Sequence, residues 1–319
     1  MIDWGSIAPG VTSAVLDPQA VNSLDQRVRR NYPATENLIL IHQHELRLSR
    51  CYSRAISLEQ KVPLRSVTKS VVSSLIGIAL EQGKIASTEQ TVAQLLPGSA
   101  ACAAGAAAAK LTLHQVLSMT GGMRWQSGRS GNEPMHMRFM RSENWVDSIL
   151  SNPVIGKNRF LFQYNTGLSH LLSAIISACT GMIAAQFASE TLFSHLGIID
   201  YTWPEDPQGI SYGGWGLEIS CIDMAKFGFL YAYDGVFNEL RLLPSCWIKT
   251  STLAHTQGYG YQWWLYDFNG VSAFSALGLG GQMITVVPDK HIVIVLTSAM
   301  AGRSRKYIEL LRDHVYSLV

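Results

Sequence analysis

The stretch Ser66-Val-Thr-Lys-Ser-Val-Val-Ser-Ser-Leu-Ile-Gly-Ile-Ala-Leu80 joins a polar head to a long apolar run. Its composition predicts a mostly buried helix over 66–82, closed by Gly83-Lys84 as a C-terminal signal. Residues three apart lie on the same face of a helix. The amine of Lys69 can therefore reach the hydroxyl of Ser66.

A hydroxyl and an amine at this spacing indicate nucleophilic chemistry. A serine hydroxyl is a weak nucleophile at neutral pH and needs a base within hydrogen-bond reach. Lysine can be that base only where burial and neighbouring groups lower its pKa well below about 10.4. Because roughly one such pattern is expected by chance in a chain of this composition, the remaining motifs must support it.

Composition excludes several function classes. The 319 residues are 47% hydrophobic and 15% charged, and the formal net charge is +2. This balance argues against a polyanionic partner, so we expect no nucleic-acid binding. Nucleophilic catalysis by a serine and a lysine needs no metal or organic cofactor, and we expect none.

Cysteine usage and hydropathy bear on the compartment. The five cysteines are scattered without a Cys-x-x-Cys motif, which favours buried free thiols in a reducing compartment. The N-terminus lacks a basic start followed by an apolar run, so no signal peptide is predicted. No apolar run approaches the roughly 20 residues of a membrane span. We expect a cytoplasmic protein without a membrane partner.

Periodicity and turn signals predict strands at both ends of the chain and helices between them. An N-terminal hairpin is predicted over 37–43 and 45–52, and Asn269-Gly270 and Pro288-Asp-Lys290 mark turns between later strands. The further predicted strands are 261–268, 271–277, 282–287 and 291–298, and the further predicted helices are 112–119, 144–150, 169–179, 184–195, 221–233 and 303–318.

These elements predict an α+β fold: an antiparallel sheet flanked by helices, with an inserted and mostly helical subdomain. We expect 1–85 and 200–319 to form the α/β subdomain and 86–199 the helical one. The active site would lie between them. The alanine-rich segment 99–109 has no amphipathic face, and we interpret it as a mobile surface loop or frayed helix.

Three further segments could contribute to a site. Tyr164 precedes the Asn165-Thr166-Gly167 turn and could relay a proton, although a core or surface tyrosine is the simpler interpretation. In Ala276-Leu-Gly-Leu-Gly-Gly-Gln282, a backbone N–H could complete an oxyanion hole with that of Ser66, although a glycine-rich turn or bulge is the simpler interpretation of this segment alone. Trp215, within Gly213-Gly-Trp-Gly216, could line a cleft or belong to the core.

In this order and spacing, the motifs resemble those of the serine β-lactamase and penicillin-binding-protein superfamily. The resemblance is to the class C β-lactamase-like branch, which includes family VIII carboxylesterases and 6-aminohexanoate-dimer hydrolases. It runs from about Asn37 to the end. The segments that carry it are Ser66–Ser70, Leu111–Gly122, Phe162–Gly167, Leu196–Ile198, Gly213–Leu217, Asp223–Gly228, Gly258–Trp264 and Gly278–Gln282.

The resemblance implies a β-lactamase/transpeptidase-like fold, with Ser66 as the acylated nucleophile and Lys69 as its base. Tyr164 matches the tyrosine of the family's Tyr-x-Asn motif, but Thr166 stands where the asparagine is expected and Asn165 is displaced by one. Ala276-Leu-Gly278 matches the Lys-Thr-Gly motif, with Leu279 N–H as the second oxyanion donor. Ala276 lacks the cation that holds a substrate carboxylate in β-lactamases and peptidases. This implies poor β-lactam recognition.

The expected function is therefore hydrolysis of a small-molecule ester or amide through an acyl-enzyme on Ser66. An acyltransferase would use the same residues, with an alcohol or amine replacing water. A binding protein that keeps the fold without turnover is the non-enzymatic alternative, which the absence of a fluorophosphonate adduct at Ser66 would favour. The natural substrate and the oligomeric state are not predicted.

Overall fold

A six-stranded antiparallel sheet forms one end of the molecule. The computed structural model describes residues 2–126, 134–156, 160–299 and 304–319. The strand order is β2-β1-β10-β9-β8-β7, so the N-terminal hairpin pairs with the last strand of the chain. The sheet strands are β1 (Thr35–His42), β2 (Glu45–Cys51), β7 (Trp264–Phe268), β8 (Val271–Gly278), β9 (Gln282–Val287) and β10 (Ile292–Ser298).

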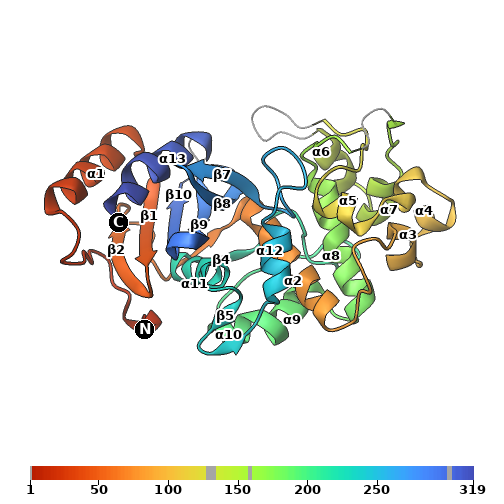
Figure 1. Cartoon of the computed structure of the whole chain (residues 1–319). Coiled ribbons are helices and arrows are strands. Elements are labelled where there is room, and N and C mark those ends of the chain that lie inside the picture. Colours follow the sequence, from red (N-terminus) through yellow and green to blue (C-terminus); the bar gives the residue numbers. More distant parts are fainter. Residues whose placement is uncertain (1, 127–133, 157–159, 300–303) are drawn as a thin grey trace.

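Both faces of this sheet are covered, which explains why its central strands are apolar at nearly every position. Alternate residues of a strand point to opposite faces. In β1, Leu38 and Leu40 face one apolar cluster, whereas Ile39 and Ile41 face another. Helices α1 (Pro18–Asn31) and α13 (Ser304–Leu310) cover the first face, and α11 (Cys221–Ala232) covers the second. Figure 1 shows α1 and α13 beside the sheet.

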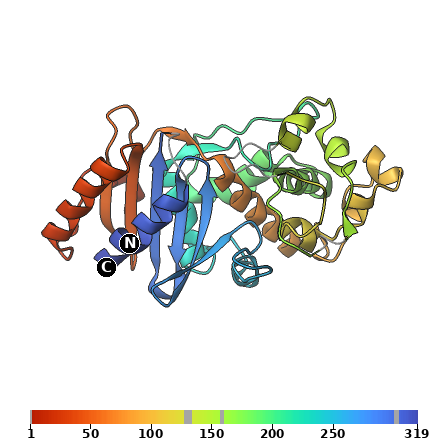
Figure 2. The same cartoon turned by 90° about the horizontal axis from the view of Figure 1, so that it is seen from above.

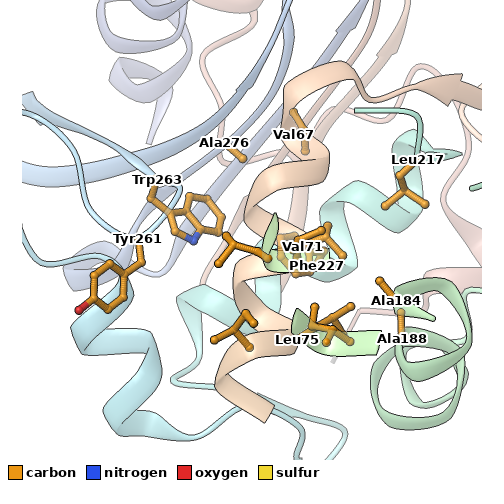
Figure 3. Close-up of a cluster of buried hydrophobic side chains, with 14 of the residues drawn as sticks. Val67, Val71, Leu75, Ala184, Ala188, Leu217, Phe227, Tyr261, Trp263 and Ala276 are labelled. Atoms are coloured by element: carbon orange, nitrogen blue, oxygen red, sulfur yellow. The ribbon is translucent and has the colours of Figure 1, made fainter. Parts of the chain in front are cut away.

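The predicted helix that follows Ser66 is present as α2 (Thr68–Glu81), preceded by a 3₁₀ turn over Arg65–Val67. Its residues from Thr68 to Ala79 are all buried. Figure 3 shows α2 passing through the larger apolar cluster, with Val67, Val71 and Leu75 among its side chains. Figures 1 and 2 place α2 between the sheet and the helices α3–α8. A helix buried on all sides fixes its first turn rigidly.

The remaining chain is mostly helical between α2 and α11. Short strand pairs join β3 (Lys61–Pro63) to β4 (Glu218–Ser220) and β5 (Val236–Phe237) to β6 (Leu240–Arg241). The other helices are α3 (Val92–Leu95), α4 (Ala100–Ala103), α5 (Leu113–Leu117), α6 (Pro134–Met140), α7 (Trp145–Leu150), α8 (Thr166–Thr180), α9 (Ala184–Ala188), α10 (Ser194–Leu196) and α12 (Ser245–Ser251). The antiparallel sheet and its flanking helices confirm the predicted fold class.

Two structural expectations were wrong in detail. The alanine-rich segment is not only surface: it forms α4 and a following 3₁₀ turn, and Ala101, Ala108 and Ala109 are buried because their small side chains allow close packing. The strand predicted from Tyr261 begins only at Trp264. Gln262 has a φ of 66°, which interrupts an extended backbone. The start of the last predicted helix, at Arg303, lies outside the described residues.

The length and hydropathy of the helices bear on whether any of them could span a membrane. Within the described ranges, no single helix combines the length and apolar composition needed to cross a membrane. Helix α8 and the segment Ala184–Leu196 meet that test only as a pair, with a bend of 73° between them.

Candidate active site

Ser66 and Lys69 lie together at the start of α2. Ser66 is in the 3₁₀ turn, and Lys69 is in the first turn of the helix. The Lys69 Nζ donates to the Ser66 Oγ at 3.1 Å. Lys69 is only 2% exposed, so its amine is withdrawn from solvent and held against the hydroxyl. This is the spacing a base needs to remove a proton from serine.

A backbone carbonyl and an aromatic ring complete the surroundings of the lysine. The Lys69 Nζ donates to the carbonyl oxygen of Gly214 at 2.6 Å and lies 5.1 Å from the centroid of the Tyr164 ring. A Cβ on Gly214 would lie 2.5 Å from Thr166 Cγ2 and 3.2 Å from the Lys69 Nζ. Glycine is therefore required for this carbonyl to approach the amine.

The loop that carries Gly214 is anchored by a buried pair. His170 on α8 and Asp206 have fully buried side chains, and their Nε2 and Oδ2 atoms lie 2.9 Å apart. The Gly213 N–H donates to the other ring nitrogen of His170 at 3.4 Å. Burial acts to raise the pKa of Asp206, but hydrogen bonds from His170 and from the N–H groups of Ile210 and Gln208 lower it overall. The ionised carboxylate thus holds the imidazole that positions the loop.

In the second predicted segment, Asn165, Thr166 and Tyr164 have different roles. Asn165 is the N-cap of α8, and its side chain accepts from the Leu168 N–H at 3.2 Å. Thr166, the first residue of the helix, lines the cavity above Ser66. Tyr164 also lines this cavity, and its ring stacks on Trp264 with centroids 5.7 Å apart. Asn165 therefore caps helix α8. Thr166, at the position where the family's motif has asparagine, lines the cavity instead.

The third predicted segment borders the same cavity along the end of β8. Leu277, Gly278 and Leu279 line the cavity, and the Leu279 side chain is 45% exposed. Ala276 is buried in the core and is not a lining residue; Figure 3 shows it among the apolar side chains beside Val67. This strand contributes no charged group at that position.

The cavity itself has a volume of about 380 Å³ and is bounded mainly by aromatic and apolar groups. Trp215 forms one wall, and its ring lies 4.1 Å from that of His136 on α6. Sequence reasoning missed His136, Met140, Trp264, Gly214 and Arg65 as lining residues. The lining residues are Arg65, Ser66, His136, Met140, Tyr164, Thr166, Gly214, Trp215, Trp264, Leu277, Gly278 and Leu279.

The donor groups needed for a metal site are not gathered anywhere in the part of the chain that the structure describes. No group of three or more histidine, cysteine, aspartate or glutamate residues is placed to hold an ion there. The polar groups at this cavity are the hydroxyls of Ser66, Tyr164 and Thr166, the imidazole of His136 and the guanidinium of Arg65, with the buried amine of Lys69 beside them.

Comparisons with known proteins agree with this fold. The beta-lactamase family model matches residues 50–315. The 6-aminohexanoate-dimer hydrolase of Paenarthrobacter ureafaciens is 23% identical over 311 residues, covering 89% of this chain and 77% of that protein. Among solved structures, the hydrolase EstCE1 matches with a TM-score of 0.74 at 17% identity, covering 93% of this chain and 98% of its own.

A second solved structure is a Bacillus anthracis protein whose assignment as a 6-aminohexanoate-dimer hydrolase is provisional. It matches with a TM-score of 0.80 at 22% identity, covering 98% of this chain and 87% of its own. At these identities the structural matches establish the fold, whereas the family model covers most of the chain. The chain belongs to the beta-lactamase family.

Proposed function

We propose that the protein is a serine hydrolase that cleaves a small-molecule ester or amide through an acyl-enzyme on Ser66. The observation that carries this proposal is the contact of 3.1 Å between the buried Lys69 Nζ and the Ser66 Oγ beside an aromatic-lined cavity. Family membership and the named hydrolase relatives support a hydrolase in general.

In the proposed first step, neutral Lys69 removes the proton from Ser66 as the oxygen attacks the carbonyl carbon. The oxyanion that forms is stabilised by the backbone N–H groups of Ser66 and Leu279, each worth roughly 3 kcal/mol in related chemistry. As the bond to the leaving alcohol or amine breaks, Tyr164 relays to it the proton that Lys69 took from Ser66, which leaves the acyl-enzyme with Lys69 neutral again. In the second step, the same groups activate water, which releases the acid and restores Ser66.

A fluorophosphonate tests the nucleophile directly. We expect one covalent adduct, located on Ser66 by mass spectrometry of peptides, together with turnover of p-nitrophenyl butyrate. Prior labelling should abolish that turnover, because one side chain serves both reactions. Labelling elsewhere, with esterase activity intact, would contradict the proposal.

Esters are the expected substrates in preference to β-lactams. The buried Ala276 places no cation on β8 where β-lactamases hold a substrate carboxylate. A charge-assisted hydrogen bond contributes about 1.5–3 kcal/mol, so its absence should lower kcat/KM for nitrocefin by about 10- to 100-fold relative to a site with that cation. We therefore expect p-nitrophenyl butyrate to be turned over with a higher kcat/KM than nitrocefin. Equal or faster nitrocefin turnover by the purified enzyme would refute this preference.

Acyl transfer is a second candidate activity at the same residues. EstCE1, which shares the fold, is described as a hydrolase with promiscuous acyltransferase activity. Products formed from p-nitrophenyl butyrate with added alcohols or amines distinguish the two. New butyryl esters or amides indicate transfer, and butyrate alone indicates hydrolysis.

A further inference from the structure

We propose that Arg65 binds a carboxylate group of the substrate, so that the preferred substrates are esters or amides with an apolar body and an anionic end. This inference rests on the proposed function and adds a substrate class to it. Arg65 immediately precedes Ser66 in the 3₁₀ turn and lines the active-site cavity. It also lines a second cavity of about 140 Å³.

The charge balance of the active-site cavity favours an anion. Among the lining residues that the structure describes, none is aspartate or glutamate, and Arg65 is the one with a permanent charge. The other walls include the rings of Tyr164, Trp215 and Trp264 and the side chains of Leu277 and Leu279. A ligand that fills this space meets mainly apolar surface, with Arg65, the hydroxyls and His136 as the polar exceptions.

The guanidinium of Arg65 has at least one N–H donor without a hydrogen-bond partner in the described ranges. Within the described ranges, it forms no ion pair within 4.0 Å, and its buried Nε has no hydrogen-bond partner. Glu36 lines the second cavity, and burial raises the pKa of its carboxyl group. Lys61, also on that cavity, is paired with Asp200 at 2.6 Å. A partly buried guanidinium with unused donors has the geometry to bind a carboxylate in a bidentate manner.

The backbone conformation at Arg65 determines the direction in which its side chain leaves the turn. Arg65 has a φ of 53°, a left-handed conformation that is unfavourable for a residue with a β-carbon. The end of β8 packs closely against this turn. A Cβ built on Gly278 would lie 2.4 Å from the Leu64 carbonyl oxygen and 3.2 Å from the Arg65 Cβ, so the two segments hold each other in place. The Leu64 N–H donates to the Leu217 carbonyl at 2.9 Å. Non-glycine residues held in this region concentrate at functional sites.

The position differs from that of the cation in related β-lactamases. The family's Lys-Thr-Gly motif corresponds to Ala276-Leu-Gly278 on β8, where Ala276 is buried. Arg65 instead comes from the turn before α2, beside the nucleophile itself. The anionic end of a flexible acyclic substrate could reach this cation, whereas the fixed carboxylate of a bicyclic β-lactam is matched to the other position.

Two pairs of substrates test the proposal and locate the carboxylate. On the acyl side, p-nitrophenyl hydrogen adipate is compared with its neutral terminal amide. On the leaving-group side, 4-(butyryloxy)benzoate is compared with 4-(butyryloxy)benzamide. We expect wild type to prefer the carboxylate in one pair by about 10-fold or more in kcat/KM, chiefly through KM.

Arg65→Met should lower that preference, the ratio of kcat/KM for the carboxylate substrate to that for its neutral partner, by about 10- to 100-fold. Arg65→Lys should retain part of the preference. Arg30→Gln, which removes one exposed positive charge from α1, should leave it unchanged. Thermal unfolding of each variant verifies the fold.

Absence of a carboxylate preference in both pairs, or its persistence in Arg65→Met, would overturn the inference. If wild type still hydrolyses the neutral esters and Ser66→Ala does not, the proposed hydrolase function stands even though the inference about Arg65 fails. If wild type shows no turnover that depends on Ser66 with any of these substrates, the proposed function itself is rejected.

Discussion

Ser66→Ala is expected to lower kcat for p-nitrophenyl butyrate by roughly 10⁴-fold or more, because no acyl-enzyme can form without the hydroxyl. The fold should persist. The Ser66 Oγ accepts one hydrogen bond from Lys69, whose Nζ retains the Gly214 carbonyl at 2.6 Å. Loss of one such bond changes the free energy of unfolding by about 1 kcal/mol. Steady-state rates and thermal unfolding, measured on the same preparation, separate the two effects.

A matched control lies one helical turn further on. Ser70 is 1% exposed, and its Oγ donates to the Gln262 carbonyl at 2.7 Å. Ser70→Ala should cost about 1–3 kcal/mol of stability, since it leaves a buried carbonyl unpaired, yet retain turnover. A folded Ser66→Ala enzyme with more than a tenth of wild-type activity would rule out Ser66 as the nucleophile.

Much of the fold follows from local sequence signals. Apolar strands with turn dipeptides predicted the hairpins. The helices predicted over 144–150 and 169–179 are present as α7 and α8, although α8 begins earlier, at Thr166 after its N-cap Asn165. The alanine-rich segment was misjudged because its packing involves a partner distant in sequence. Asp147 on α7 accepts from the Ser99 hydroxyl and from the Ala101 N–H. Such tertiary contacts leave no periodic signal in the segment itself.

Local sequence predicts the position of some site residues but not of others. Ser66 and Lys69 are three residues apart, so helix geometry alone brings them together. His136 lies in no motif, and Trp264 ends the Gly258–Trp264 segment of the resemblance, which assigns it no role. Both residues reach the cavity through the packing of α6 and β7. In the segment Gly213–Gly216, the sequence pointed to Trp215 and gave Gly214 no role. Its carbonyl reaches Lys69 because the buried His170–Asp206 pair, distant in sequence, anchors the loop.

The role of Lys69 as the base can be tested with two substitutions that treat its charge differently. Lys69→Met removes the amine from a buried position while preserving an unbranched apolar stem. Lys69→Arg preserves a positive charge but cannot give up its proton, since the guanidinium pKa exceeds about 12. If the amine accepts the Ser66 proton, both variants should lose about 10²- to 10⁴-fold in kcat/KM, and fluorophosphonate labelling should slow in parallel.

Stability provides the internal control for these variants. Lys69→Met leaves the Gly214 carbonyl without the donor it has at 2.6 Å, a loss of about 1–3 kcal/mol. Removal of a buried amine offsets part of that cost, because desolvation no longer opposes folding. Lys84→Met, at an exposed position after the same helix, should change neither activity nor labelling. Lys69→Arg with activity within tenfold of wild type would show that positive charge suffices, and would exclude proton transfer to this side chain.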